Sequence, residues 1–262
     1  MWGTGEAYEP FMGRWSRAVA AAFVRRLDLP PGLDWLDVGC GTGAVTREVL
    51  RGAGPAGVTG VDRSEDYVRH ARRHVRDPRA RFVRGDAEAL PLPDARAAVA
   101  VSGLVLNFVP GPARAAAELV RVVRPGGTVG VYLWDYADDG MGLLCRFWEA
   151  AAALDPGCRS VDERARFPLC GREPLRALLT GAGLAGVTVS AIEVPTVFRD
   201  FADYWDPFLG GQGPAPGYVA SLGPARRAAL RERLRATLPR AADGSVPLTA
   251  RAWSATGRRP GP

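Results

Sequence analysis

Short apolar runs alternate with amphipathic stretches along the first half of the chain. A short apolar run bounded by turn residues predicts a buried strand, whereas apolar positions three and four residues apart predict a helix. We expect strands at about 35–38, 58–61, 81–83, 98–106 and 128–134, and helices at about 16–27, 44–51, 65–75 and 114–123. Buried strands separated by helices are typical of a parallel sheet that is covered on both faces.

The alternation changes after Trp134. We expect further helices at about 140–154 and 173–180, and two longer strands at 187–197 and 246–255 that could pair antiparallel. The sequence therefore predicts an α/β fold with a doubly wound, Rossmann-like sheet of seven mostly parallel strands. An antiparallel strand pair would close its C-terminal end, and helical cap insertions would interrupt the later part of the chain.

The chain shows no internal repeat, and we expect a single domain over residues 1–262. Its parts would be a core, an N-terminal lid and two caps. The core would cover about 30–136, 173–198 and 245–258, the lid 1–29, and the cap insertions about 137–172 and 199–244.

A glycine-rich turn, Gly39-Cys40-Gly41-Thr42-Gly43, directly follows the first strand and precedes a helix. Glycines let the backbone turn sharply and let a ligand approach where a Cβ would otherwise stand. Doubly wound sheets bind ligands at this edge. The run also satisfies the dinucleotide pattern G-x-G-x-x-(G/A), so the turn alone leaves open dinucleotide binding and a tight turn without a ligand.

Three carboxylates end three consecutive strands: Asp37, Asp62 and Asp86. Asp62 stands about 20 residues past the glycine turn, where an acidic side chain can accept hydrogen bonds from ribose hydroxyls. A helix N-cap is the alternative role for Asp62, although Ser64 would serve it at least as well. The carboxylate of Asp86 could accept a hydrogen bond from the amine of adenine. Such an acidic edge disfavours a pyrophosphate and suits a cofactor that carries a sulfonium and an ammonium.

These motifs resemble the class I S-adenosylmethionine-dependent methyltransferases. The resemblance rests on the glycine motif 37–43, on Asp62, on Gly85-Asp86-Ala87 and on the signature Val122-Val123-Arg124-Pro125-Gly126-Gly127. The subgroup that the chain resembles is the ubiquinone/menaquinone C-methyltransferase-like set. The segments 8–16 and 134–136 resemble a bacterial branch of that set, and the family implies S-adenosyl-L-methionine as the cofactor.

The family implies a role for each matching position. Gly39, Cys40 and Gly41 would pass along the methionine part of the cofactor. Asp62 would hold the ribose, and Arg63 would pack on the adenine.

Five further positions complete the implied cofactor site. Asp86 and Ala87 would meet the adenine amine, and Ser102 would lie at the methionine side after the fourth strand. Tyr8 and Trp15 would fold down from the N-terminus as part of a lid, unless they only pack the entry of the first helix.

A methyl group on a sulfonium is already activated, so the protein has to align an acceptor in line with the S–CH₃ bond and exclude water. No metal is required, and we assign no catalytic base. His70 and His74 stand one helical turn apart on a solvated face. Asp135, Tyr136 and Tyr204 are better placed, but packing or rim positions would explain them equally well.

The caps are expected to cover the pocket of a small-molecule methyl acceptor. Their aromatic residues would line a pocket for a flat or apolar molecule, or alternatively pack a core. These residues are Phe147, Trp148, Phe167, Tyr204, Trp205 and Phe208.

The amino-acid composition excludes several classes of chemistry and of binding partner. All 34 basic residues are Arg, which excludes lysine-dependent chemistry such as Schiff bases and P-loop phosphate binding. The net charge of +6 is spread along the chain among acidic residues, so we expect no nucleic-acid partner. The four cysteines lack metal-ligand spacing, and no apolar run approaches the length of a membrane span. We expect a cytoplasmic protein with no metal and no membrane partner.

Two other functions stay open from the sequence. One is an NAD(P)-dependent oxidoreductase, against which the third carboxylate and the missing Lys argue. The other is a domain that binds the cofactor without transferring a methyl group, as a sensor, a scaffold or a recruited enzyme.

Overall fold

The structure is a computed structural model that describes residues 13–137, 140–210 and 213–261. The chain divides into two compact units. Unit 1 takes its described residues from 1–15, 134–170 and 193–252, and unit 2 takes them from 16–133, 171–192 and 253–262. The expected division into one core, a lid and two caps stays a prediction.

A seven-stranded sheet runs through the fold in the order β3-β2-β1-β4-β5-β7-β6. The first five strands run parallel to one another, and the two long C-terminal strands are antiparallel, as the sequence predicts. The strands are β1 Asp34–Val38, β2 Gly57–Asp62, β3 Ala80–Arg84, β4 Ala97–Gly103, β5 Val123–Trp134, β6 Ala185–Phe198 and β7 Val246–Arg258.

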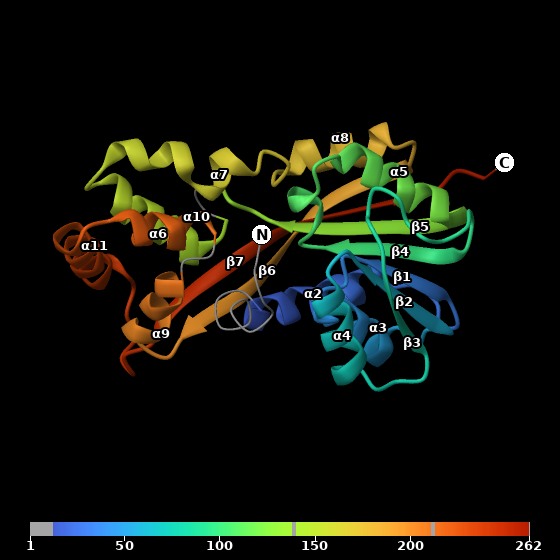
Figure 1. The fold of residues 1–262 in the computed structure, drawn as a ribbon, viewed down its shortest axis with the longest axis horizontal. Helices are drawn as coiled ribbons and strands as arrows, with labels where there is room; N and C mark the ends of the chain where they lie inside the picture. The colour runs from blue at the N-terminus through green and yellow to red at the C-terminus, as the bar shows by residue number, and fades with distance from the viewer. Residues whose placement is uncertain (1–12, 138–139, 211–212, 262) are drawn as a thin grey trace. The chain divides into compact units, whose positions relative to one another are not determined.

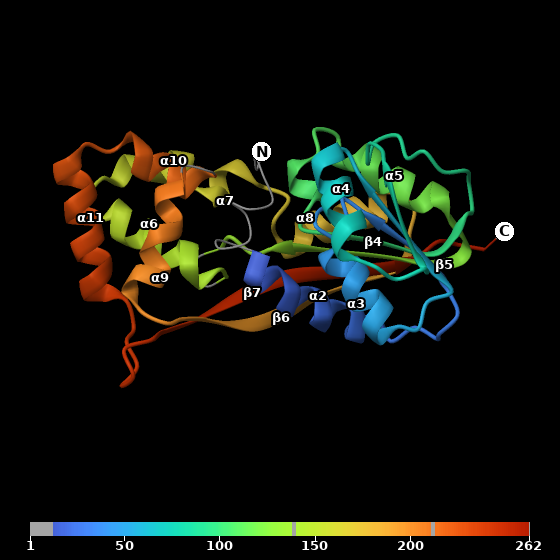
Figure 2. The same ribbon diagram turned by 60° about the horizontal axis from the view of Figure 1, so that its bottom comes forward.

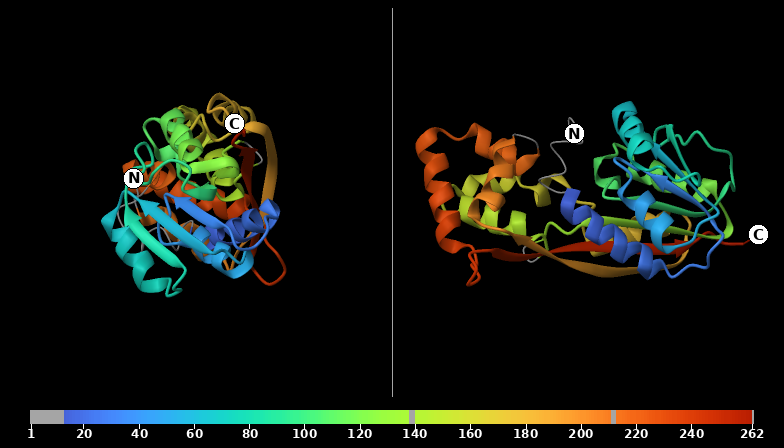
Figure 3. Two further views of the ribbon diagram at one scale, coloured as in Figure 1. Left: turned by 90° about the vertical axis from the view of Figure 1, so that its right-hand side faces the viewer. Right: turned by 90° about the horizontal axis from the view of Figure 1, so that it is seen from below.

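Helices cover both faces of the parallel strands in unit 2. On one face lie α2 Arg14–Leu27, α3 Ala44–Gly52 and α4 Glu65–His74, and on the other lie α5 Pro112–Val122 and α8 Arg172–Gly181 (Figures 1 and 3). The ring of Phe23 in α2 packs on that of Tyr132 in β5, with 4.8 Å between centroids. Gly130 permits this approach, because a Cβ there would lie 2.9 Å from the Phe23 ring. The doubly wound prediction is therefore confirmed.

Two strand boundaries differ from the prediction. β5 begins at Val123 and not near residue 128, because Pro125-Gly126-Gly127 forms a bulge: β4 pairs Ala97 with Val123 but Val99 with Thr128. A Cβ at Gly127 would come within 2.6 Å of the Ala98 carbonyl oxygen, so only glycine fits there. β4 ends at Gly103, where the apolar run turns into a short 3-10 helix, η2 Leu106–Phe108.

Unit 1 contains the remaining helices, of which α6, α10 and α11 lie side by side in Figure 2. They are α6 Gly142–Ala152, η3 Pro156–Val161, α7 Glu163–Arg166, α9 Phe201–Trp205, η4 Asp206–Gly210, α10 Pro214–Ser221 and α11 Pro224–Thr237. Phe147, Tyr204 and Phe208 are fully buried, and the Phe147 and Phe208 rings stack 4.5 Å apart. Of the two roles considered for these three aromatic residues, pocket lining and core packing, the structure shows core packing.

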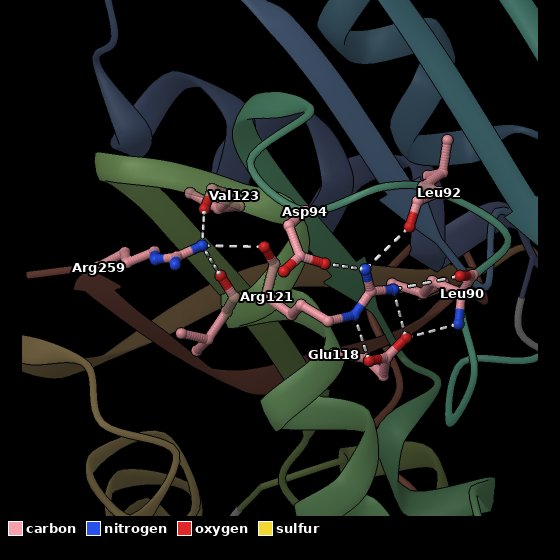
Figure 4. Close-up of polar contacts among 8 residues, drawn as sticks. Leu90, Leu92, Asp94, Glu118, Arg121, Val123 and Arg259 are labelled. Atoms are coloured by element: carbon pink, nitrogen blue, oxygen red, sulfur yellow. Dashed lines mark hydrogen bonds and ion pairs between the residues drawn. The ribbon is translucent and has the colours of Figure 1, made fainter.

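The loop from β3 to β4 is tied to α5 by Arg121 (Figure 4). The guanidinium donates to the carbonyl oxygens of Leu90 at 3.2 Å and Leu92 at 2.9 Å. It also forms ion pairs of 2.6 Å with Asp94 and with Glu118. Glu118 in turn accepts a hydrogen bond of 2.7 Å from the Leu90 amide. The loop that begins with Asp86 is thus held to the helix behind it.

We predict that Arg121→Ala lowers the free energy of unfolding by roughly 1–2 kcal/mol, because several charge-assisted hydrogen bonds are lost from a partly exposed site. Urea unfolding measures this change. Arg114→Ala is the matched control on the same helix, since Arg114 is exposed and forms one ion pair of 3.9 Å. Equal stability of both variants would contradict a role for Arg121 in holding the loop.

Candidate functional site

The glycine turn after β1 is shaped by its packing against two strands. The amides of Gly39 and Cys40 both donate to the Val61 carbonyl oxygen, at 2.7 and 3.0 Å. Gly39 has φ of +74°, and a Cβ there would lie 2.4 Å from the Val105 side chain. Gly41 also has positive φ, +50°, but nothing lies within 4 Å of its Cβ position. The turn is therefore closely packed at its first glycine and open at its second, which leaves space for a ligand there.

Asp62 joins the end of β2 to this turn. Its Oδ2 accepts a hydrogen bond of 2.9 Å from the Gly41 amide, and its Oδ1 accepts one of 2.8 Å from the Ser64 amide. Burial raises the pKa of Asp62, while these two hydrogen bonds act to lower it. The side chain of Ser64 accepts from the Tyr67 amide and caps α4, so the capping role falls to Ser64. Each oxygen of Asp62 keeps a lone pair for a further donor.

Asp37 is buried at the end of β1, and only one of its two carboxylate oxygens accepts hydrogen bonds from the described residues. Its Oδ2 accepts from the Thr46 amide at 3.0 Å and from the Thr46 hydroxyl at 2.6 Å. In the part of the chain that the structure describes, its Oδ1 has no hydrogen-bond partner, and neither has the buried Oγ of Ser102 in β4. Burial is the main cause that raises the pKa of Asp37 to about 6. Buried polar atoms without a partner are costly, so both atoms suit a polar ligand.

The remaining sequence-predicted residues divide by burial. The Cys40 side chain lies in a core cluster with Val68, Ala71 and Phe82, and burial raises the pKa of its thiol. Only the backbone of Cys40 is therefore available to a ligand. Asp86, by contrast, is exposed, and its Oδ1 accepts from the Glu88 amide at 2.9 Å.

Positions beside these acids complete the predicted set. Arg63 is exposed after β2, and Ala87 is half-buried after Asp86. The Gly85 amide donates to the Asp62 carbonyl oxygen at 3.0 Å, which ties the end of β3 to that of β2. The structure thus brings the ends of β1, β2 and β3 together, as the sequence predicts.

Of the two lid residues, Tyr8 lies outside the described residues. Trp15 belongs to unit 1, where its ring packs edge-on against Phe198 with 5.3 Å between centroids. The Arg14 guanidinium lies 4.4 Å from the Trp15 ring and forms an ion pair of 3.0 Å with Asp203. These contacts show packing, and the lid role of Trp15 stays a prediction.

Two of the three side chains considered for catalysis, Asp135 and Tyr204, have structural partners in unit 1. Asp135 is buried and forms an ion pair of 2.7 Å with Arg251, and its other oxygen accepts from the Ala137 amide. The Tyr204 hydroxyl donates to the Leu143 carbonyl oxygen at 2.9 Å inside the core. Both side chains therefore stabilise the fold locally.

The histidines lie on an exposed helix face. The rings of His70 and His74 stack 4.0 Å apart, and His74 Nδ1 donates to the His70 carbonyl oxygen at 2.8 Å. Among residues 13–137, 140–210 and 213–261, no group of His, Cys, Asp or Glu side chains could hold a metal ion. None of the helices in these ranges is long and apolar enough to span a membrane.

Sequence reasoning missed the buried acid Glu163. It stands in the charged run Asp162-Glu163-Arg164, which suggests a solvated face, yet only 4% of its surface is exposed. Its partners, the Trp148 indole and the Ala215 amide, come from distant segments. No local pattern in the sequence marks a residue that is buried by such contacts.

A family model described as a methyltransferase domain matches residues 36–131. These residues run from β1 to β5 and include the site from Asp37 to Ser102. This segment therefore matches a methyltransferase domain, in agreement with its resemblance to the class I S-adenosylmethionine-dependent methyltransferases.

Curated relatives of this chain include two that match most of it. A 2-methyl-6-phytyl-1,4-hydroquinone methyltransferase from Synechocystis sp. is 40% identical over 188 residues, which are 71% of this chain and 57% of the relative. An uncharacterized 37.1 kDa protein in transposon TN4556 of Streptomyces fradiae is 32% identical over 216 residues, 79% of this chain and 60% of the relative. The chain thus spans about three fifths of the length of these relatives.

Solved structures share the fold of this chain at low identity. The YcgJ protein from Bacillus subtilis matches with a TM-score of 0.60 at 16% identity, over 95% of this chain and 100% of that chain. Phosphoethanolamine N-methyltransferase 2 from Haemonchus contortus, in complex with S-adenosyl-L-methionine, matches with a TM-score of 0.57 at 17% identity. That match covers 96% of this chain and 56% of the other. These likenesses confirm the Rossmann-like fold.

We predict that Asp37 makes the protein less stable as pH rises through the window from 3.8 to about 6. Because the pKa of Asp37 is raised in the folded state, the native state binds more protons than the unfolded state in this window. The contribution of Asp37 to stability is therefore largest below pH 3.8 and falls as pH rises. Asp37→Asn removes that part of the pH dependence, which urea unfolding at a series of pH values measures. Asp34→Asn, at the exposed start of β1, is the control and keeps the wild-type slope.

Proposed function

We propose that this protein transfers a methyl group from S-adenosyl-L-methionine to a small-molecule acceptor by in-line displacement. The observation that supports this most strongly is the arrangement of Asp37, Gly41 and Asp62 at the ends of β1 and β2, within the segment that the methyltransferase family model matches. Two buried acids beside an open glycine form a polar, negatively charged edge for a cationic cofactor.

The residues of this edge fit the parts of the cofactor. The remaining lone pairs of Asp62 suit the ribose hydroxyls, and the exposed Asp86, with Ala87 beside it, suits the adenine amine. Arg63 is exposed next to Asp62 and would pack on the adenine.

The methionine part would lie along the glycine turn. The Gly39-Cys40-Gly41 backbone would border it, and the open space at Gly41 leaves room for it. The Asp37 Oδ1 and Ser102 Oγ atoms, which have no hydrogen-bond partner among the described residues, would gain polar contacts on this side. We keep Tyr8 and Trp15 as the lid.

The chain contributes to the reaction mainly by position. When bound, the cofactor supplies a methyl group that its sulfonium already activates. Holding acceptor and donor in line can lower the barrier by about 7–11 kcal/mol. Asp62 and the glycine turn would fix the donor, and exclusion of water would favour transfer to the acceptor over hydrolysis. We assign no general base.

The acceptor is proposed to be a small organic molecule. The Synechocystis relative is named for a hydroquinone, which agrees with a quinone methyltransferase-like subgroup for this chain. A nucleic-acid acceptor is not favoured, because many of the arginines form ion pairs with neighbouring acids, as Arg79 does with Asp77 and Arg69 with Asp66. The four free cysteines agree with a reducing, cytoplasmic location.

We predict that S-adenosylmethionine and its demethylated product S-adenosylhomocysteine bind with dissociation constants in the micromolar range, about −8 kcal/mol, whereas NAD(H) does not bind. Isothermal titration calorimetry measures all three. If heat is released with NAD(H) and not with the other two ligands, the proposed function would be wrong and an oxidoreductase would be favoured. If the cofactor binds, incubation with a metabolite extract and isotopically labelled S-adenosylmethionine should label a small molecule, whereas no labelled product would favour a non-methylating binding domain.

We predict that Asp62→Ala weakens S-adenosylmethionine binding at least tenfold, or by about 1.4 kcal/mol, because hydrogen bonds from a charged group are lost. The same titration measures the change. Asp66→Ala serves as a matched control, because Asp66 is exposed on α4 and pairs only with Arg69 among the described residues. Unchanged affinity in a folded Asp62→Ala protein would show that the ribose does not lie at Asp62.

A further inference from the structure

Unit 1 contains a cavity of about 350 Å³ that is formed by the segment after β5, by α6, by η3 and by α7. Its walls include Tyr136, Leu144 and Trp148, and Glu163 belongs to its lining. This volume lies in the range that small-molecule pockets have. All of these residues belong to unit 1, so the cavity is described by that unit alone.

Glu163 is the unusual group of this cavity. Only 4% of its surface is exposed, and its two oxygens accept hydrogen bonds from the Trp148 indole and from the Ala215 amide, the latter at 3.2 Å. Both donors are neutral. Burial, with a smaller contribution from the negative charge of Asp162, raises the pKa of Glu163 to about 7. Glu163 is therefore a buried acid that ionises near neutral pH with neutral donors as its hydrogen-bond partners.

The charged and titratable groups around Glu163 come from each neighbouring element. From α6 come Cys145, whose pKa burial raises to about 11, and the exposed Glu149, which pairs with Arg146 at 3.0 Å. From η3 and α7 come Arg159 and Arg164, both exposed, and the buried Asp162, which caps α7.

Two further groups complete these surroundings. Tyr136 lines the cavity from the segment after β5, and on α10 the Tyr218 hydroxyl donates to Asp155 at 3.4 Å. Among all groups of the described residues that shift the pKa of Glu163, none is a cation.

We propose that this cavity binds a small organic amine, whose ammonium group pairs with the Glu163 carboxylate while its apolar part lies against Trp148, Tyr136 and Leu144. A buried carboxylate without a cation is costly, and an ammonium ion supplies the missing charge together with hydrogen-bond donors. The aromatic and aliphatic walls favour an amine with a flat or apolar body over a small hydrophilic one. The proposal concerns unit 1 alone and is independent of the function proposed for unit 2.

The pairing predicts that amine affinity depends on pH. The ammonium binds the ionised form of Glu163, and a pKa of about 7 makes that form about a tenth of the population at about pH 6 and about nine tenths at about pH 8. Affinity should therefore rise about tenfold between these two pH values, with a proton released on binding in the lower part of the range.

The experiment titrates the full-length protein with 2-phenylethylamine, with its neutral analogue 2-phenylethanol and with the anionic 3-phenylpropanoate, by calorimetry at about pH 6 and about pH 8. We expect the amine to bind at least tenfold more tightly than either analogue at the higher pH. Equal affinity for the amine and the alcohol, tighter binding of the carboxylate, or no binding of the amine would each overturn the proposal. These comparisons need only the wild-type protein.

A pair of variants then locates the site. Glu163→Gln should weaken amine binding at least tenfold and abolish its pH dependence, whereas Glu149→Gln, at an exposed acid of the same cavity, should leave both within about threefold. Amine binding that Glu163→Gln leaves unchanged would refute the assignment. Asp62→Ala should bind the amine like the wild type, so a failure of this proposal and a failure of the methyl-donor site are separate results.

Discussion

The site in unit 2 depends on hydrogen bonds from backbone amides to buried carboxylates at the ends of β1 and β2. Asp62 accepts from Gly41 and Ser64, and Asp37 accepts from Thr46. Each of these bonds joins a strand end to the segment that follows a strand, so the shape of the glycine turn and the positions of the acids are determined together. Because buried acceptors without donors are costly, another shape of the turn would leave these acids unsatisfied.

Three buried acids of this protein differ in the partners that their carboxylates have. Asp135 is paired with the cation of Arg251 and is complete within the fold. Asp37 is satisfied at one oxygen only, and Glu163 is satisfied by neutral donors, so burial raises the pKa of both. An acid that the fold leaves without a cation retains a capacity for a ligand. This difference separates the structural acid from the two that we connect with binding.

Much of the fold could be predicted because its signals are local. The apolar period locates β1 to β5 within a few residues, and the glycine turn lies where strand and helix meet. The strand boundaries that differ from the prediction depend on tertiary packing. The bulge at Gly126 and Gly127 arises where β5 changes register against β4, and a strand pattern alone does not record the register of its neighbour.

The sequence by itself determined the order of strands and helices along the chain, the acids that end neighbouring strands and the methyltransferase family that these motifs resemble, because spacing along a chain follows from residue type and period. Only the tertiary structure decided which of these acids are buried, which have donors, and that the Cys40 side chain faces a core while Glu163 lines a cavity. Burial and charge pairing depend on residues far apart in the chain, such as Glu163 and Ala215, and no local pattern encodes their contact.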